Sequence, residues 1–364
     1  MAWTRRQLLI AGGGLVGVGL AQGLKLQSGN GLAQSPVIPP EGQSLAMAPA
    51  GFYAPPRGSV RIAVISDLNS QYGSTHYEAE VIESMRLLPQ WKPDLVLCGG
   101  DMIAGQSLSL SRGQVQAMWA AFDRHVAAPL RQAGLPFGFT IGNHDGSGAL
   151  EREGRFRFAL DRELARAYWK QPSHNPGLTF VDQAQFPFSY TFTQNQIFYL
   201  VWDASTAQIS EAQLGWVERS LASAAAQQAR LRMVIGHLPL YGIAVGRDRP
   251  GEFLNQAERL RSLLERYRVH TYISGHHHAY YPGHRGQLQL LHTGALGSGP
   301  RRLLGSDRTP QKTLTIVDVS LEPANTRYTT YDMTTRQVLD SRQLPTQISA
   351  PNGRVFRRDI NPGA

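Results

Sequence analysis

The chain has 364 residues, enough for one large domain or two ordinary ones, and its 42% of hydrophobic residues is ordinary for a soluble globular protein with a buried core. The formal net charge of +9 favours anionic ligands or surfaces in general. It does not by itself indicate nucleic acid, because the sequence has no long run of Lys and Arg and no stripe of stacking aromatic residues; we expect no nucleic-acid partner.

The first predicted element is an export signal over residues 1–33. Arg5 and Arg6 precede a modestly apolar, glycine-rich stretch, and this composition is typical of export signals. Glycines 12–14 disfavour a buried helix, and the stretch is less apolar than the roughly 20 residues that a permanent membrane span needs. The segment Thr4–Leu9 resembles a twin-arginine signal. The resemblance implies export of a folded protein to the periplasm or beyond in a bacterium, with no stable membrane span after signal removal.

A linker and one large domain are predicted to follow. Residues 34–58 contain six prolines and are predicted to form an extended linker. The domain is predicted over residues 59–345, with a C-terminal tail over 346–364. Within it, the segment 146–186 breaks the regular pattern and is predicted to be an inserted lid.

Short apolar runs alternate with amphipathic stretches along the predicted domain. The predicted strands are 60–65, 94–97, 137–141, 196–201, 232–235, 271–273, 288–291 and 313–319. The predicted helices are 77–88, 114–132 and 211–224. The only cysteine, Cys98, ends an apolar run, which indicates a buried thiol in a strand. The alternation of strands and helices indicates an α/β layered domain.

Residues with metal-ligand chemistry follow five of these strands. The five segments are Ser66-Asp67-Leu68-Asn69, Gly99-Gly100-Asp101, Gly142-Asn143-His144-Asp145, Gly236-His237 and Gly275-His276-His277-His278. One Asp, Asn or His after a strand is usually a turn former, a helix cap or a hydrogen-bonded loop residue. Five together predict a common site, because the carboxyl ends of strands in α/β sheets face the binding crevice. Oxygen from Asp and Asn with nitrogen from His suits manganese, iron or zinc.

The order of these motifs resembles that of the calcineurin-like metallophosphoesterase family over residues 60–319. The resemblance implies a four-layer α/β/β/α sandwich that holds two divalent metal ions. The ligands that it implies are Asp67, Asn69 and His278 for the first ion, Asn143, His237 and His276 for the second, and Asp101 for both. It also implies that His144 is the proton donor to the leaving oxygen, steadied by Asp145, and that His277 points away from the metals.

This set of residues suits hydrolysis of phosphate esters. Two cations about 3.5–4 Å apart hold a hydroxide and clamp phosphoryl oxygens, and the expected reaction is attack of metal-bound hydroxide on a phosphomonoester or a phosphodiester. Asp101 has two oxygens with which to bridge the ions, and Asn143 adds a neutral oxygen. His144 is the right kind of residue for a general acid, because the ordinary histidine side chain exchanges its proton near neutral pH. We therefore expect a dinuclear phosphatase or phosphodiesterase.

Asn69 departs from the family pattern, which usually has His at this position. Asn is a weaker ligand than imidazole for zinc or iron, and this favours manganese or magnesium in the first site, or loose binding there. An alternative is a non-catalytic metal- or phosphate-binding protein of the same fold, although such a protein has no need of His144 and Asp145. A nuclease is a third possibility, disfavoured by the absence of a basic aromatic groove.

Overall fold

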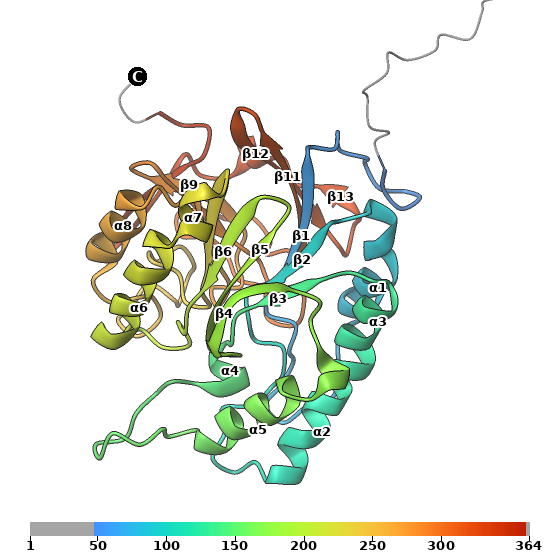
Figure 1. Ribbon diagram of the computed structural model, residues 1–364. Coiled ribbons are helices and arrows are strands. Elements are labelled where there is room, and N and C mark those ends of the chain that lie inside the picture. Colours follow the sequence, from blue (N-terminus) through green and yellow to red (C-terminus); the bar gives the residue numbers. More distant parts are fainter. Residues whose placement is uncertain (1–46, 362–364) are drawn as a thin grey trace, which may run out of the picture. The chain divides into compact units, whose positions relative to one another are not determined.

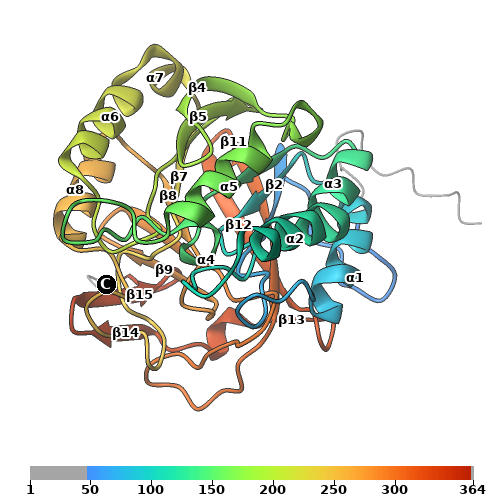
Figure 2. The same ribbon diagram turned by 90° about the horizontal axis from the view of Figure 1, so that it is seen from below.

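The computed structural model describes residues 47–361. The predicted export signal and the first part of the predicted linker, residues 34–46, lie outside the described residues. Two β-sheets pack face to face, and helices cover the outer face of each (Figures 1 and 2). This arrangement confirms the predicted four-layer α/β/β/α sandwich. Among the helices of residues 47–361, none is long and apolar enough to cross a membrane.

The first sheet has six strands in the order β13-β12-β11-β1-β2-β3. Their bounds are β1 (Val60–Ile65), β2 (Leu95–Cys98), β3 (Phe137–Phe139), β11 (Thr313–Leu321), β12 (Ala324–Asp332) and β13 (Gln337–Val338). Strands β1, β2 and β3 are parallel, whereas β11, β12 and β13 add antiparallel neighbours on one side.

The second sheet has nine strands in the order β14-β15-β9-β10-β8-β7-β6-β5-β4. Their bounds are β4 (Thr179–Gln185), β5 (Ser189–Gln194), β6 (Ile197–Val201), β7 (Leu231–Ile235), β8 (Thr271–Ser274), β9 (Tyr281–Arg285), β10 (Leu288–His292), β14 (Gln347–Ala350) and β15 (Gly353–Arg357). Strands β6, β7, β8 and β10 form its parallel centre, so their carboxyl ends share one edge.

Helices form the two outer layers. The α-helices are α1 (Ala79–Leu87), α2 (Arg112–Phe122), α3 (Ala128–Gln132), α4 (Asn143–Gly146), α5 (Ala159–Trp169), α6 (Glu211–Ala222), α7 (Ala224–Gln228) and α8 (Ala257–Arg266). The short elements are the 3-10 helices η1 (Leu88–Trp91), η3 (Pro172–His174) and η4 (Ser341–Gln343) and the π-helical turn η2 (Asp123–Ala127). Ser111 and Ser210 begin α2 and α6, because each side chain accepts a hydrogen bond from a backbone N–H of the first turn.

Alternate side chains of β1 enter different cores. Ile62 and Val64 pack between the two sheets with residues of the nine-stranded sheet. Ala63 and Ile65 pack on the other face, beneath the helices that cover the six-stranded sheet. A strand that is buried on both faces is apolar on both, and β1 is apolar apart from Arg61, which is why the sequence predicts this strand with its observed bounds.

The predicted lid is wrong for most of its length. Helix α5 belongs to the core, since Leu164 and Ala165 are buried and the ring of Trp169 stacks on Phe139 with centroids 3.9 Å apart. Strand β4 pairs with β5 at the edge of the sheet. Only residues 149–157, called the arm below, project from the fold as a short hairpin (Figure 1).

The predicted C-terminal tail is also wrong. Strands β14 and β15 form an antiparallel hairpin, and Phe356 of β15 pairs with His284 of β9. The hairpin therefore extends the nine-stranded sheet. No clear apolar run marks this segment, because an edge hairpin buries one face only.

The described part of the predicted linker, residues 47–58, is fixed to the domain although it contains no strand or helix. The ring of Phe52 meets Trp91 edge-on at 5.1 Å between centroids. Arg61 donates hydrogen bonds to the carbonyl oxygens of Met47 and Pro55 and forms a buried ion pair with Asp318, at 2.8 Å between Nε and Oδ1. Arg61 thus joins this segment to both central strands of the six-stranded sheet.

Candidate functional site

The five predicted motifs meet where strands of the two sheets end. The backbone N–H of Asp67 donates to Gly100 O at 2.9 Å, which joins the loops after β1 and β2. The backbone N–H of Gly275 donates to His237 O at 3.0 Å, which joins the loops after β7 and β8. The packing needs glycine at two points, because a Cβ at position 275 would lie 2.2 Å from Ser66 Oγ and one at 142 would lie 2.2 Å from Asp101 Oδ1.

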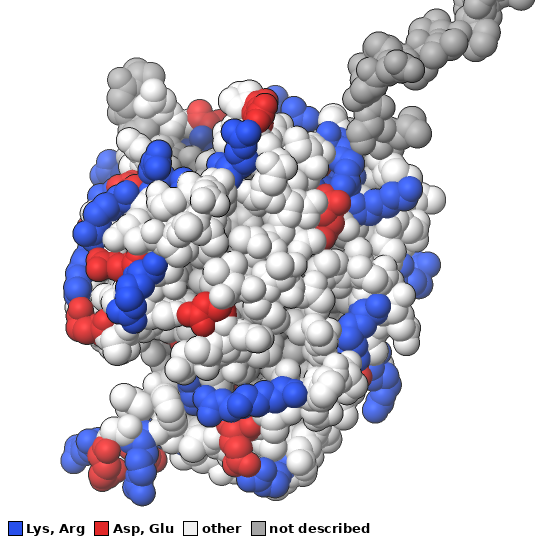
Figure 3. Space-filling model, viewed as in Figure 1, with Lys and Arg blue, Asp and Glu red and all other residues white. Residues whose placement is uncertain are grey.

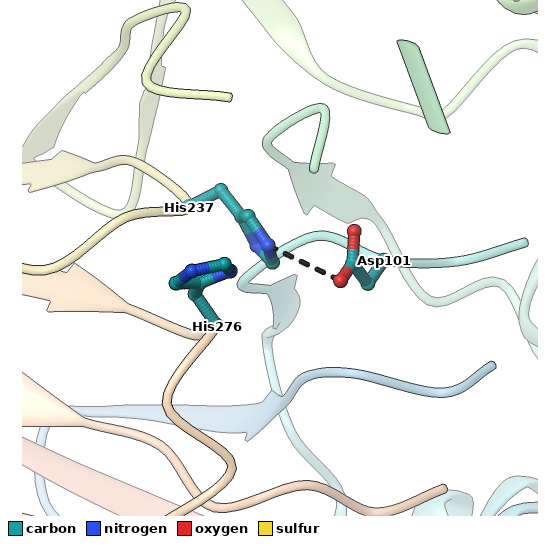
Figure 4. Close-up of side chains that lie close together, drawn as sticks. All are labelled: Asp101, His237 and His276. Atoms are coloured by element: carbon teal, nitrogen blue, oxygen red, sulfur yellow. Dashed lines mark ion pairs between the residues drawn. The ribbon is translucent and has the colours of Figure 1, made fainter. Parts of the chain in front are cut away.

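One cluster of side chains contains Asp101, His237, His276 and Asn143. His237 Nε2 lies 3.2 Å from Asp101 Oδ2. Figure 4 shows the His237 ring directed toward the Asp101 carboxylate, with the His276 ring beside it. Asn143 Oδ1 lies 2.9 Å from His237 Nε2 and 2.9 Å from His276 Nδ1. Because His237 Nδ1 is bound to Gly99 O at 2.7 Å, its Nε2 is the nitrogen that faces the cluster.

A second cluster shares Asp101 with the first. It contains Asp67, Asp101 and His278, whose ligand atoms lie within 4.8 Å of one another. His278 Nε2 lies 3.4 Å from Asp67 Oδ1, while its Nδ1 is bound to Gly299 O at 3.0 Å. The structure therefore brings these predicted ligands together around Asp101.

Asn69 is buried beside the second cluster. Its backbone N–H donates to Asp101 O at 3.2 Å and its carbonyl accepts from Ser298 N at 3.1 Å. Within residues 47–361, no hydrogen bond of its side-chain amide is seen, which leaves that amide available to a ligand. His277 behaves as the resemblance implied: its Nε2 is bound to Glu252 O and its Nδ1 accepts from Ile243 N.

Four of the predicted ligands have a left-handed backbone. The φ angles are 50° at Asp67, 54° at Asp101, 64° at His276 and 53° at His278. Such angles are uncommon outside glycine and cost about 1–3 kcal/mol each when the surroundings impose them. Strain of this kind gathers at ligand sites and active sites, so its presence at four converging donors marks this edge as the functional one.

The charges in the two clusters depend strongly on one another. Burial by itself raises the pKa of Asp101, but His237 and His144 outweigh it and hold that pKa far below its ordinary value. Burial opposes the charged form of His237, yet Asp101 raises its pKa to about 9. Burial lowers the pKa of His276 to about 4. Buried carboxylates and imidazoles in such proximity are the donors that a divalent cation binds after displacing their protons.

His144 lies at the margin of the clusters. Its Nε2 is 4.0 Å from Asp101 Oδ2, and its Nδ1 is 3.1 Å from Gly105 O. Its backbone N–H donates to Asp101 Oδ1 at 2.9 Å, and the ring of Tyr72 lies 5.0 Å away between centroids. The ring is thus held by a backbone carbonyl and faces the predicted bridging carboxylate.

The predicted support of His144 by Asp145 is wrong. The Asp145 carboxylate accepts hydrogen bonds from the backbone N–H groups of Met102, Ile103 and Gly142, at 2.7, 2.9 and 2.8 Å. Burial and the nearby Asp101 raise the pKa of Asp145 to about 7. Asp145 therefore fixes the loop that carries Asp101 against helix α4 and does not contact the imidazole.

A family model described as calcineurin-like phosphoesterase matches residues 60–280. The chain belongs to this family. The match covers all five motifs and confirms the resemblance found in the sequence.

Solved structures align with this chain. A purple acid phosphatase isolated from yellow lupin (Lupinus luteus) seeds aligns with a TM-score of 0.52 and 17% identity, over 79% of this chain and 54% of that chain. GAP50, the anchor in the inner membrane complex of Plasmodium, aligns with a TM-score of 0.48 and 12% identity, over 77% and 87%. At 17% identity the likeness to the lupin protein shows the fold alone, and this chain spans about half the length of that protein. No curated protein matches the sequence.

The donors of this family member fit divalent metal ions. The two clusters contribute carboxylate oxygen and imidazole nitrogen and share one carboxylate, Asp101. Carboxylate, amide and imidazole together suit manganese, iron or zinc better than a purely oxygen-loving ion such as calcium. The left-handed backbone of Asp67, Asp101, His276 and His278 directs these donors into one small volume.

Glu252 is a site residue that the sequence did not indicate. Its Oε2 lies 3.0 Å from His276 Nε2, and Arg247 pairs with the same carboxylate. The hydrogen bond from His276, with Arg247 adding to it, holds the pKa of Glu252 far below its ordinary value. Since Nε2 faces Glu252, Nδ1 is the nitrogen of His276 that faces Asn143 and the first cluster. A lone Glu in a loop between two motifs gave no sequence signal.

A cavity of about 370 Å³ opens beside the clusters. Asn143, His144 and His276 line its inner end, and Arg247 and Glu252 line another part of the wall. A phosphate ester that entered it would meet two of the predicted ligands, Asn143 and His276, together with the predicted proton donor His144.

Proposed function

We propose that this protein is a metal-dependent phosphoesterase that hydrolyses a phosphomonoester or a phosphodiester. The observation that carries the proposal is the sharing of Asp101 by two clusters of donors, one of which reaches an open cavity through His276. Membership of the calcineurin-like phosphoesterase family supports the reaction class.

Each predicted residue has a place in this proposal. Asp67, Asn69 and His278 would hold one divalent cation, His237, His276 and Asn143 would hold the other, and Asp101 would contact both. When bound, the two cations supply a hydroxide nucleophile near neutral pH and positive charge for the phosphoryl oxygens. Glu252 keeps Nδ1 of His276 directed at its cluster.

His144 donates a proton to the leaving oxygen in this proposal. Gly105 O accepts from Nδ1, so the proton to be transferred is carried by Nε2, on the side of Asp101. The wall of the cavity includes His144, which places the ring within reach of a bound ester. Asp145 contributes by holding the loop of Asp101 and not by touching the imidazole.

We also propose a location and a metal preference. The Arg5-Arg6 pair and the apolar stretch that follows support export to the bacterial periplasm. Asn69 supports manganese, or magnesium, over zinc or iron in the site that it would form with Asp67 and His278. Metal analysis of purified protein tests this preference, and zinc or iron held tightly in both sites would contradict it.

The decisive experiment measures hydrolysis of p-nitrophenyl phosphate, bis-p-nitrophenyl phosphate and ethyl phosphate with added Mn²⁺. Asp101→Ala is expected to lose turnover on every ester together with metal. His144→Ala is expected to lose about 10²–10⁴-fold on ethyl phosphate and far less on the nitrophenyl esters, whose leaving group needs no proton. The controls are Asp340→Ala, at the residue that precedes η4, and His284→Ala, on β9, and both should keep full activity.

Two outcomes would contradict the proposal. If wild-type protein binds the metal but turns over no ester with any divalent ion, the non-catalytic metal-binding function is favoured instead. If His144→Ala loses the same factor on nitrophenyl and ethyl esters, His144 has a structural role and is not the proton donor.

A further inference from the structure

A second cavity, of about 620 Å³, adjoins the one that holds the predicted site. The two cavities share three lining residues, Ala149, Thr206 and Ala207. The second cavity lies between the arm and the loop that leads from β6 to helix α6. A ligand bound in the first cavity can therefore continue into the second without leaving the protein surface.

The arm presents apolar side chains to this second cavity. Leu150 and Phe156 pair across the hairpin and both line the cavity, and they are 59% and 44% exposed. The tip of the arm is charged, with Glu151, Arg152, Glu153 and Arg155. Figure 3 shows this tip at the lower left with charges of both signs. A hairpin with a charged tip and two apolar side chains turned to a cavity is arranged to contact an apolar ligand.

Two polar residues that line the second cavity, Asp203 and Gln213, are already paired. The Asp203 carboxylate forms an ion pair with Arg162 at 2.7 Å and accepts from Ser205 Oγ at 2.6 Å. The Gln213 amide accepts from Asp203 N and donates to Asp203 O. Asp203 and Gln213 therefore have little capacity left for a polar ligand, and Leu150, Phe156, Ala149 and Ala207 give the cavity its apolar surface.

The arm is held in place at its base. The guanidinium of Arg162 lies 4.2 Å from the centre of the Phe156 ring and donates to Gly146 O at 2.8 Å. Together with its ion pair to Asp203, these contacts connect the arm to helix α5 and to the end of β6. The apolar surface is thus preorganised, which lowers the entropic cost of binding.

The direction of the leaving group connects the two cavities. In the proposed function, the leaving oxygen lies beside His144, and the first cavity that His144 lines is also lined by Ala149, which lines the second cavity as well. We propose that the second cavity binds the alcohol part of the substrate, and that this part carries an extended apolar group, alkyl or aryl. This inference rests on the proposed phosphoester hydrolysis.

Esters of alcohols with similar acidity test this subsite, because their intrinsic reactivity is alike. We would compare kcat/KM for ethyl, hexyl and 2-phenylethyl phosphate with Mn²⁺-loaded protein, or for their methyl diesters if the protein is a diesterase. The test variant carries both Leu150→Ser and Phe156→Ser. The control variant is Val338→Ser, because Val338 is an exposed apolar residue on β13 of the six-stranded sheet.

Wild type and Val338→Ser should prefer the hexyl or phenylethyl ester over the ethyl ester by on the order of tenfold or more, since several methylenes leave water. In the double variant this ratio should fall below about threefold. Preference for hexyl over phenylethyl would identify an alkyl group, and the reverse an aryl group. Equal rates for all three esters in wild type, or an unchanged ratio in the double variant, would overturn the subsite.

Binding separates this inference from the proposed function. Hexylphosphonate and ethylphosphonate cannot be hydrolysed, and their affinities for Mn²⁺-loaded wild type and double variant can be measured by calorimetry. Tighter binding of hexylphosphonate, lost in the double variant, supports the subsite even if turnover of every ester fails. Equal affinities overturn the subsite even if ester hydrolysis is confirmed.

Discussion

Glu252 offers a sharp test of the metal site because it contacts a predicted ligand without being one. Its carboxylate lies 3.0 Å from His276 Nε2, its side chain is 14% exposed, and Arg247 and Arg249 pair with it. With Nε2–H donated to Glu252, the lone pair of Nδ1 is directed at the cluster of Asp101 and His237. Removing Glu252 frees the His276 ring to rotate and to change tautomer. The metal ion that His276 shares with His237 and Asn143 should therefore bind more weakly.

The size of the effect follows from this one hydrogen bond. A hydrogen bond to a charged group contributes about 1.5–3 kcal/mol, and each 1.4 kcal/mol is about tenfold in affinity. We therefore expect Glu252→Ala to weaken one of the two metal sites by about 10–100-fold, which is the usual range for such supporting carboxylates. Glu252→Gln keeps an acceptor but loses the charge, so its loss should be smaller.

Titration of metal-free protein with Mn²⁺, followed by calorimetry, measures both sites without relying on turnover. Glu265→Ala is the matched control, because Glu265 is similarly buried at 21% side-chain exposure and pairs with Arg261 on helix α8, away from the site. Its affinities should equal those of wild type. If Glu252→Ala also binds two ions with wild-type affinity, the hydrogen bond to His276 does not support the metal site and the reasoning fails.

Two further predictions concern stability. Arg61→Ala leaves Asp318 buried without its cationic partner and removes the hydrogen bonds to the carbonyl oxygens of Met47 and Pro55. Urea unfolding should therefore show a free energy of unfolding lower by about 3–5 kcal/mol. A decrease under about 1 kcal/mol would show that water replaces the guanidinium. Burial lowers the pKa of His270 to about 4 from an ordinary 6.5. The unfolded chain therefore binds this proton first, and stability falls by up to about 3 kcal/mol as pH drops from 6.5 toward 4. Between pH 7 and 4.5, metal-free His270→Gln should lose less unfolding free energy than metal-free wild type; equal losses would contradict the assignment.

The strands that the sequence predicted are those buried on both faces. β2 and β6 are continuous apolar runs, β1 and β7 are apolar apart from Arg61 and Arg232, and each of the four was predicted to within one residue at either end. β12 is polar along much of its length and β9 contains Pro282 and Gly283, so neither has a strand pattern of its own. Their pairing with β11 and β10 overrides weak local propensity, and that information lies in the tertiary structure.

The sequence predicted the site residues that follow buried strands. It did not predict the contacts between residues of different loops. Asp67, Asp101 and His237 could be placed because the strand ends share one edge. His144 and Asp145 are neighbours on helix α4, and side chains at i and i+1 of a helix diverge, which is why adjacency wrongly suggested contact. Glu252 reaches His276 only because the loop after β7 folds back over the loop after β8.

The arrangement around His144 favours hydrolysis over metal storage. A protein that only binds metal requires the donors around Asp101, and all of them are in place whether or not Asn69 is a strong ligand. It does not require an imidazole that Gly105 O holds 4.0 Å from the shared carboxylate, in the wall of a cavity and outside the two clusters. That position is of use to a leaving group that needs a proton. The second cavity begins along the same wall, at Ala149, where the rest of such a leaving group would extend.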